Sequence, residues 1–319
     1  MNELSCLVTG VAGFVGSHLA ERLIEKGNFV TGLDSFTDYY PRAVKESNLS
    51  PLKKNPNFRF VEGDINTVDL PKLLRQVDFI FHLAGQPGVR PSWGTSFTKY
   101  LNDNILATQH LLESCRKAKI RKFVYSSSSS VYGDAERLPT PEDVTPRPFS
   151  PYGATKLAAE HLCQIYFRNF SVPTVIMRYF TVYGPRQRPD MAFNKFISAI
   201  STDGTVDVNG DGSQSRDFTF VEDTVSATIL AKDANSGRTF NVGSGGTVTL
   251  SNALAMLETI IGKKAKLAYH GVAAGDAIRT SADISRIESE LGYVPKVALR
   301  EGLGSQVAWQ LGRVSETSN

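Results

Sequence analysis

The chain has 319 residues, 41% of them hydrophobic and 21% charged, with a formal net charge of +3. This length suits one large globular domain or two joined ones, and the charge balance argues against a disordered tail protein or a dedicated nucleic-acid binder. The three cysteines fit neither a disulfide framework nor a zinc site, the five histidines show no metal spacing, and no apolar run reaches ~18 residues. We therefore expect a cytoplasmic protein without a metal site or a membrane segment.

Strand-like runs alternate with helical periodicity in the N-terminal part of the chain. Strands are predicted at Leu4–Val8, Asn28–Leu33, Phe58–Glu62, Phe79–Leu83, Lys122–Ser126 and Pro173–Arg178. Helices are predicted at Phe14–Lys26, Leu101–Ala118 and Tyr152–Asn169. This alternation is typical of crossover units and a parallel sheet, so the predicted fold class is α/β, a Rossmann-type doubly wound sheet.

The texture of the sequence changes after Gly184, where loops and short elements become frequent. We expect residues 1–183 to form a nucleotide-binding domain, with residues 221–243 returning to it through a helix at Val221–Asp233. Residues 184–319 are then expected to form mainly a smaller, mixed substrate-binding domain. The cleft between the two domains is the expected position of the ligands.

A glycine-rich turn joins the first predicted strand to the first predicted helix. Thr9–Gly16 reads T-G-V-A-G-F-V-G, so Gly10, Gly13 and Gly16 stand three residues apart. Glycines at these positions permit a tight turn, close approach of a pyrophosphate and close packing of helix on strand. The spacing alone is weak evidence, but its strand–turn–helix context predicts a dinucleotide site at a helix N-terminus.

Asp34 ends the second predicted strand, 18 residues after Gly16. A carboxylate at this point accepts hydrogen bonds from the adenosine ribose and repels the 2′-phosphate of NADP, so we expect NAD. The alternative is that Asp34 only caps a turn. The residues expected to surround NAD are Gly10, Gly13, Phe14, Val15, Gly16, Asp34, Asp64, Ile65, Leu83, Ala84 and Gly85.

Tyr152 and Lys156 stand four residues apart in a predicted helix, so they face the same side of it. A free tyrosine has a pKa of ~10, and a neighbouring ammonium lowers that pKa by favouring the phenolate. Such a phenolate takes the proton of an alcohol while an oxidised cofactor accepts the hydride. The spacing also occurs by chance, and the alternative is an exposed helical pair.

Five serines, Ser126–Ser130, follow the apolar run Phe123–Tyr125. A serine run is commonly a flexible linker. This run stands at the end of a predicted central strand, where open parallel sheets bind ligands. A hydroxyl there bridges the substrate hydroxyl and Tyr152, so the three motifs together predict oxidation of an alcohol.

These three motifs together resemble the extended short-chain dehydrogenase/reductase family, specifically its NAD-dependent nucleotide-sugar epimerases and dehydratases. The resemblance covers nearly the whole chain. It implies that Ser128, Tyr152 and Lys156 form the catalytic triad. It also implies that Tyr152 and Lys156 contact the cofactor and that Tyr179 and Phe180 lie beside the nicotinamide.

The same resemblance implies two further features of the long helices. Asn104, in the first of them, is expected to be a polar contact near the active centre. A homodimer is expected to form through two helices from each chain, Leu101–Ala118 and Tyr152–Asn169. Neither feature follows from the sequence pattern alone.

The segment Asp211–Phe218 resembles the nucleotide-diphosphate clamp of the family. Arg216 is expected to meet the diphosphate, because a guanidinium forks onto phosphate oxygens. Phe218 is expected to lie near the base of a UDP-sugar.

The segment Ala273–Asp276 resembles the family's late ribose-binding segment, so Asp276 is expected at the substrate. Galactose-type epimerases carry an arginine at the position of Ala273. We expect Arg188 or Arg279 to replace that phosphate contact.

The residues after the triad serine distinguish the reactions of the family. A 4,6-dehydratase normally carries an Asp-Glu pair at the positions of Ser129 and Ser130, and a UDP-glucuronate decarboxylase carries Glu at the position of Ser130. Hydroxyls cannot do the acid–base work of those carboxyls. What remains is oxidation at C4 of the sugar to a ketone and return of the hydride to the opposite face, which is epimerisation.

The sugar is indicated by residues 88–93 and 181–192, which resemble UDP-glucuronate 4-epimerases. A 4-keto uronic acid loses carbon dioxide if its carboxylate turns perpendicular to the carbonyl. The hydroxyls of Ser129, Ser130 and Thr181 are expected to hold that carboxylate, and Arg90 to supply charge nearby. The expected substrate residues are Arg90, Asn104, Ser128, Ser129, Ser130, Thr181, Arg188, Arg216, Phe218 and Asp276.

Several alternatives remain open at this point. The substrate is UDP-glucose or UDP-N-acetylglucosamine in one alternative, and the enzyme is a UDP-glucuronate decarboxylase or a 4,6-dehydratase in others. A non-enzyme alternative is an NAD-binding sensor, although sensors of this type have lost Tyr or Lys and this chain keeps Tyr152 and Lys156.

Overall fold

The fold, a computed structural model that describes residues 4–272 and 274–317, is built on one parallel sheet. This sheet has seven strands, in the order β11-β6-β5-β4-β1-β2-β3. These are β1 (Ser5–Thr9), β2 (Phe29–Asp34), β3 (Phe58–Glu62), β4 (Phe79–His82), β5 (Lys122–Ser128), β6 (Thr174–Tyr179) and β11 (Thr239–Val242). The chain runs outward from β1 in one direction and from β4 in the other, so the prediction of a doubly wound Rossmann-type sheet is confirmed.

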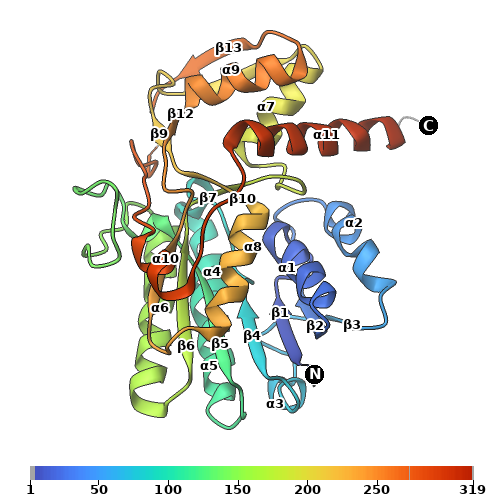
Figure 1. The fold of residues 1–319 in the computed structure, drawn as a ribbon, viewed down its shortest axis with the longest axis vertical. Helices are drawn as coiled ribbons and strands as arrows, with labels where there is room; N and C mark the ends of the chain where they lie inside the picture. The colour runs from blue at the N-terminus through green and yellow to red at the C-terminus, as the bar shows by residue number, and fades with distance from the viewer. Residues whose placement is uncertain (1–3, 273, 318–319) are drawn as a thin grey trace.

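Helices cover both faces of the sheet (Figure 1). One face carries α1 (Phe14–Glu25), α2 (Arg42–Lys53) and α8 (Val221–Leu230), and the other carries α3 (Leu70–Leu73), α5 (Ala107–Cys115) and α6 (Pro151–Phe170). The strands therefore bury apolar side chains on both sides, which explains their short, nearly continuous apolar runs. In β1, Cys6 and Val8 join one core while Leu7 joins the other.

A smaller unit lies above the carboxyl ends of the strands in Figure 1. It contains α7 (Ala192–Ser201), α9 (Leu250–Ile261), α11 (Leu299–Thr317) and the parallel pair β8 (Thr205–Asn209) and β13 (Lys266–His270). Its remaining strand pairs are β7 (Thr181–Tyr183) with β10 (Phe218–Phe220), and β9 (Ser215–Arg216) with β12 (Val248–Thr249). Its core is continuous with the core on the α1 face, so the two units share one apolar interior.

Between the two units the chain crosses back to the sheet. After β10 it enters α8, which packs beside α1, and then β11, which pairs with β6 at the edge of the sheet. The helix α10 (Ser285–Leu291) also returns and packs near β11. No helix among the described residues is long and apolar enough to cross a membrane.

Two elements differ from the sequence predictions. The segment predicted as one helix at Leu101–Ala118 is a π-helix, η3 (Leu101–Leu106), followed by α5, with the short helix α4 (Phe97–Tyr100) before it. The helix α2 was not predicted, because it is polar along most of its length and buries Leu49 and Leu52 in the core.

Candidate active site

A cavity of about 410 Å³ lies at the carboxyl ends of the strands, where open parallel sheets bind ligands. Its walls come from the sheet unit and from the segment that leads into the smaller unit. The predicted site residues that line it are Gly10, Gly13, Phe14, Val15, Gly16, Asp34, Asp64, Ile65, Leu83, Ala84, Gly85, Ser128, Ser129, Ser130, Tyr152, Lys156, Tyr179, Phe180, Thr181 and Arg188.

The glycine-rich turn has no room for side chains. Gly10 has a φ of +69°, and a Cβ on it would lie 2.8 Å from the backbone nitrogen of Ala84. A Cβ on Gly16 would collide with the carbonyl of Gly10, which accepts a hydrogen bond from the Gly13 amide at 3.0 Å. Helix α1 begins here without a side-chain cap, so the amides of its first turn remain for an anionic ligand at the positive end of the helix.

Asp34 lies at the end of β2 and holds this turn together. Its carboxylate accepts from the backbone amides of Ala12 at 3.0 Å and Phe36 at 2.9 Å. Burial raises the pKa of Asp34, and these hydrogen bonds and the charge of Lys45 oppose the rise. A carboxylate has about four acceptor positions, so the turn-capping bonds leave capacity for ribose hydroxyls.

The start of α6 places Tyr152 in the cavity. Ser150 caps the helix by accepting from the Gly153 amide at 3.1 Å, and Pro151 occupies the first helical turn. Both residues are favoured at a helix start, because the serine satisfies a free amide and proline lacks one. Tyr152 thus stands in the first turn, where its phenol meets the hydroxyl of Ser128.

Burial raises the pKa of Tyr152, while the hydrogen bond with Ser128 and the positive charge of Arg188 lower it. We expected Lys156 to supply that charge. The Lys156 ammonium instead donates to the carbonyl of Ser126 at 2.6 Å and lies 4.8 Å from the centroid of the Tyr125 ring. Burial lowers the pKa of Lys156 to about 8.

The serine run is part of the sheet, not a linker. β5 continues through it, because Ser126, Ser127 and Ser128 pair in register with Met177, Arg178 and Tyr179 of β6. The chain then turns in a short 3-10 helix, η4 (Ser129–Val131), whose first serines face the cavity.

Three further hydroxyl-bearing side chains lie in the same cavity as Ser128 and Tyr152. Ser129, Ser130 and Thr181 all line the cavity. Ser128 is linked to Ser130 directly, since its hydroxyl donates to the Ser130 hydroxyl at 3.2 Å and accepts from the Ser130 amide at 3.1 Å. The cluster therefore presents neutral hydrogen-bonding groups next to Tyr152.

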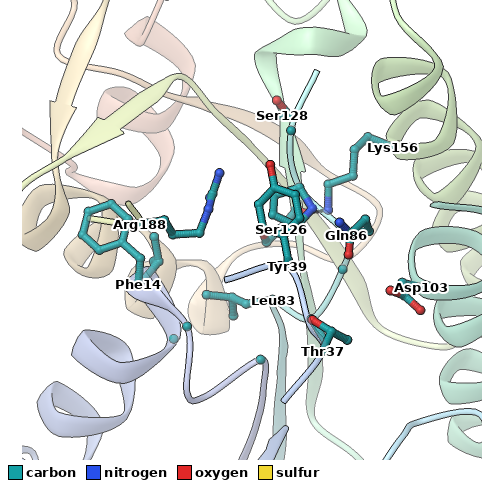
Figure 2. A pocket seen from close by; sticks show the side chains of 18 of the residues that line it. Phe14, Thr37, Tyr39, Leu83, Gln86, Asp103, Ser126, Ser128, Lys156 and Arg188 are labelled. Carbon is teal, nitrogen blue, oxygen red and sulfur yellow. Dashed lines mark hydrogen bonds between the residues drawn. The ribbon is translucent and has the colours of Figure 1, made fainter. Parts of the chain in front are cut away.

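Arg188 enters the cavity from the opposite side to Lys156, as Figure 2 shows. Its guanidinium makes a two-pronged salt bridge with Asp190, at 2.9 and 3.0 Å. Tyr39 supports the pair by donating to Asp190 at 3.2 Å, and its ring lies 5.8 Å from the guanidinium. The arrangement holds a positive charge within electrostatic reach of Tyr152.

Asn104 does not line the cavity but holds its floor. The buried Asn104 amide accepts from the Gln86 amide at 2.7 Å and donates to the Gln86 carbonyl at 3.1 Å and to Thr155 at 3.0 Å. It therefore ties the segment after β4 to α6, three residues from Tyr152. Its side chain is occupied by protein partners, so this side chain braces the site and does not reach the cavity.

Arg216, Arg90 and Asp276 form a second polar cluster outside the main cavity. Arg90 donates to Asp276 at 2.7 Å. Burial is the main cause that lowers the pKa of Arg216, and the positive charge of Arg90 lowers it further. Arg216 donates to the carbonyls of Ser215 and Ile278, at 2.9 and 3.1 Å. Within the described residues no carboxylate lies at salt-bridge distance from Arg216, so an anion there would be favourable.

Phe218, which was predicted near the base, does not line the cavity. Its side chain is 8% exposed and packs in the core with its ring centroid 4.7 Å from that of Phe193 and 6.4 Å from that of Tyr183. It is therefore not free to lie against a nucleotide base. Arg279 pairs by its backbone with Ser215, beside Arg216, while Ala273 lies outside the described residues.

The cavity also contains residues that the sequence reading missed. They come from the segment after β2, from α2, from the segment after β4 and from the π-helix, and include Thr37, Tyr39, Tyr40, Lys45, Gln86 and Asp103. Burial, and then the charge of Asp64, raises the pKa of Asp103 to about 6. The only sequence signal for Asp103 was its place beside Asn104.

The residues that line the cavity fit a dinucleotide. The glycine cradle that a Cβ would fill, the open start of α1 and the Asp34 carboxylate occupy the places that a pyrophosphate and a ribose require. Among the described residues, no three or more His, Cys, Asp or Glu side chains are grouped to hold a metal ion.

Comparison with known proteins identifies the family. Residues 6–243 match the model of the NAD dependent epimerase/dehydratase family. A UDP-glucuronate 4-epimerase of Thermodesulfobacterium geofontis is 37% identical over 95% of this chain and 95% of its own length. YtcB of Bacillus subtilis, an uncharacterised UDP-glucose epimerase, is 43% identical over 96% of this chain and 98% of its own length.

Solved structures agree with the family match. The complex of UDP-glucuronic acid 4-epimerase from Bacillus cereus with UDP-glucuronic acid and NAD superposes with a TM-score of 0.95 and 42% identity. The match covers 97% of this chain and 100% of that one. The chain therefore belongs to the NAD dependent epimerase/dehydratase family.

Proposed function

We propose that the protein is an NAD-dependent UDP-sugar 4-epimerase that interconverts UDP-glucuronate and UDP-galacturonate. The observation that carries the proposal is the lining of one cavity: Ser129, Ser130 and Thr181 line it together with Tyr152, and no carboxyl stands in the place of Ser130. The similarity to UDP-glucuronate 4-epimerases over nearly the whole chain supports the same activity.

NAD, when bound, would supply the hydride acceptor and donor for C4 of the sugar, and the hydride would return to the other face of the ketone. Gly10, Gly13 and Gly16 would receive its pyrophosphate and Asp34 its adenosine ribose, because the cradle and the carboxylate are the groups suited to each. Lys156 would hold the nicotinamide ribose hydroxyls.

Tyr152 is the proposed base. Its phenolate takes the proton of the sugar 4-hydroxyl, directly or through Ser128, as the C–H bond at C4 breaks. After the ring turns over, Tyr152 returns a proton to the oxygen of the new alcohol. The positive charge of Arg188 and the Ser128 hydrogen bond oppose the effect of burial and favour the phenolate.

The hydroxyl cluster has a separate task. The 4-keto form of glucuronate is a β-keto acid, so its carboxylate must not turn perpendicular to the ketone. Ser129, Ser130 and Thr181 would hold the carboxylate by hydrogen bonds, which are strengthened when the acceptor is charged. Arg216 would bind the diphosphate from the outer cluster, with Arg90, Asp276 and Arg279 around it.

The test is proton NMR of the purified protein with UDP-glucuronate and no added NAD. Appearance of UDP-galacturonate supports the epimerase, its bound cofactor and the acid sugar together. A UDP-pentose product would mean decarboxylation and would overturn the argument from Ser130. If only UDP-glucose were turned over, the activity would be that of a UDP-glucose epimerase, as in the name of YtcB.

We also propose a homodimer and a cytoplasmic protein with two domains. The helices η3 and α6 carry exposed apolar side chains, which suit a helical interface: Leu101, Leu106, Ile165 and Phe170. The cysteines are free and buried, which suits a reducing compartment. The domains would be residues 1–183 with 221–243, and the remainder of 184–319. Light scattering tests the dimer, and a monomer in Ile165→Glu but not in wild type would locate its interface.

A further inference from the structure

The face of α6 that carries the catalytic pair continues for one more turn. Tyr152, Lys156 and Glu160 stand at successive intervals of four residues, so they form one stripe along the helix. Glu160 is 1% exposed. An ionised carboxylate is rarely buried unless it is paired and hydrogen-bonded, so its partners indicate its purpose.

Each member of the stripe is tied to a different serine of β5. Tyr152 meets the hydroxyl of Ser128, Lys156 donates to the carbonyl of Ser126 at 2.6 Å, and Glu160 accepts from the hydroxyl of Ser127. These contacts together hold the helix to the last three residues of the strand. A displacement of Glu160 would be passed to Lys156, one turn away on the same rigid helix.

The Glu160 carboxylate is fixed from the other side by Arg178 of β6. The guanidinium donates to it through Nε at 2.9 and 3.2 Å and through Nη2 at 2.7 Å. Arg178 also donates to the hydroxyl of Tyr132 at 2.8 Å, and Tyr132 donates to Asn241 of β11 at 2.7 Å. The carboxylate therefore has a single orientation set by three strands.

The charge of Glu160 also acts on Lys156 from one helical turn away. Burial lowers the Lys156 pKa and the Glu160 charge opposes that effect. The other titratable groups near the ammonium are Cys163 on α6, Tyr125 on β5 and His82 on β4, with Tyr152. Burial raises the pKa of Cys163 and Tyr125 and lowers that of His82 to about 3, so these three stay neutral near pH 7.

We propose that Glu160 is a positioning residue of the active site, which orients the Lys156 ammonium and balances its charge through a carboxylate locked by Ser127 and Arg178. The functional motif on α6 is then Tyr-x-x-x-Lys-x-x-x-Glu, with all three residues on one face of the helix. This role rests on the proposed function where it is tested by turnover of UDP-glucuronate, but not where it is tested by retention of NAD.

The test uses the NAD-loaded enzyme with Glu160→Gln, Glu160→Asp and, as a matched control, Glu113→Gln. Glu113 also accepts from a tyrosine and an arginine, but it is exposed on α5. Turnover of UDP-glucuronate is measured from pH 6 to 9.5, and NAD retained after gel filtration is measured over the same range. Circular dichroism checks that each variant is folded.

Glu160→Gln is expected to move the alkaline limb of turnover down by about one pH unit, because without the carboxylate the ammonium loses its proton at lower pH. The deficit against wild type should grow about tenfold between pH 6.5 and 8.5. Retained NAD should fall over the same interval. Glu160→Asp should restore the wild-type limb, and Glu113→Gln should not move it.

The proposal would be overturned if folded Glu160→Gln lost the same fraction of turnover at every pH and retained as much NAD as wild type. Glu160 would then have a structural role only. If this variant does not fold, the double variant Glu160→Gln with Arg178→Gln removes the buried pair as a unit and takes its place. If the alkaline limb of turnover in the double variant matched that of wild type, Arg178 would cancel the charge effect of Glu160. This result would also overturn the proposal. Absence of wild-type turnover would instead refute the proposed function, and NAD retention would still test Glu160.

Discussion

Gly16→Ala separates helix propensity from the steric requirement of the cofactor cradle. Alanine is better than glycine inside a helix by about 1 kcal/mol, so propensity alone predicts a gain. A Cβ on Gly16, however, would collide with the carbonyl oxygen of Gly10 and lie 2.9 Å from its carbon and 3.1 Å from Cα of Val11. These are backbone atoms, which cannot rotate away. Overpacking of this kind costs about 1–3 kcal/mol, which exceeds the gain.

The expected result is a loss of cofactor. Because the displaced turn is the cradle itself, a cost of about 1–3 kcal/mol taken from binding weakens NAD affinity by about 5- to 150-fold. Gly304→Ala is the matched control, since Gly304 is also helical, in α11, and nothing lies within 4 Å of a Cβ there. It should gain about 1 kcal/mol of stability and keep its NAD.

The assay is the nucleotide content of the purified, denatured protein by chromatography, together with titration of NAD into stripped protein. Thermal unfolding measures how far each variant differs in stability from the wild type. A Gly16→Ala protein with full NAD content and wild-type affinity would refute the steric reasoning. Loss of NAD in Gly304→Ala would show that helix substitutions disturb the site without contact.

Three other predictions follow from the same cavity. Tyr152→Phe should lower turnover by about 10²- to 10⁴-fold while NAD content stays unchanged; a sensor would have no turnover to lose. The double variant Ser130→Ala with Thr181→Ala should lower the preference for UDP-glucuronate over UDP-glucose by about 10- to 100-fold, because hydrogen bonds to a carboxylate contribute about 1.5–3 kcal/mol. An unchanged ratio of the kcat/KM values for the two substrates would exclude the carboxylate site. Burial raises the pKa of Asp103 to about 6, so its contribution to stability is lost as pH rises through 6. Asp103→Asn should therefore raise the unfolding free energy at pH 7.5 by about 1 kcal/mol after allowance for solvent screening, with little effect at pH 4.5; equal effects at both pH values in chemical denaturation would contradict this.

The strands were predictable because both faces of this sheet are buried. Phe79–Leu83 was predicted only one residue longer than β4, whose residues are all buried, since apolar runs of this length are typical of interior parallel strands. The strand predicted to end at Ser126 continues to Ser128. Hydrophobic periodicity cannot show this extension, because the last serines are held by pairing with β6 and by α6, not by apolar burial.

The floor of the cavity depends on contacts distant in sequence. Asn104 braces the Gln86 backbone, and the π-helix that carries it interrupts what the sequence presents as a regular helix. π-Helical turns are frequent at functional sites, but no local pattern marks one. The error over Phe218 has the same origin: its burial depends on Phe193 and Tyr183, whose positions follow from the packing of the smaller unit.

The electrostatics of Tyr152 show most clearly why motifs were sufficient to find the site but not to explain it. The four-residue spacing identified Lys156, yet the cation that lowers the Tyr152 pKa in the structure is Arg188, which enters from the segment leading into the smaller unit. Arg188 is held there by Asp190, and Asp190 by Tyr39 of the sheet unit. The pKa of Tyr152 is therefore influenced by residues from both units. Lys156 donates to the Ser126 carbonyl and lines the same cavity.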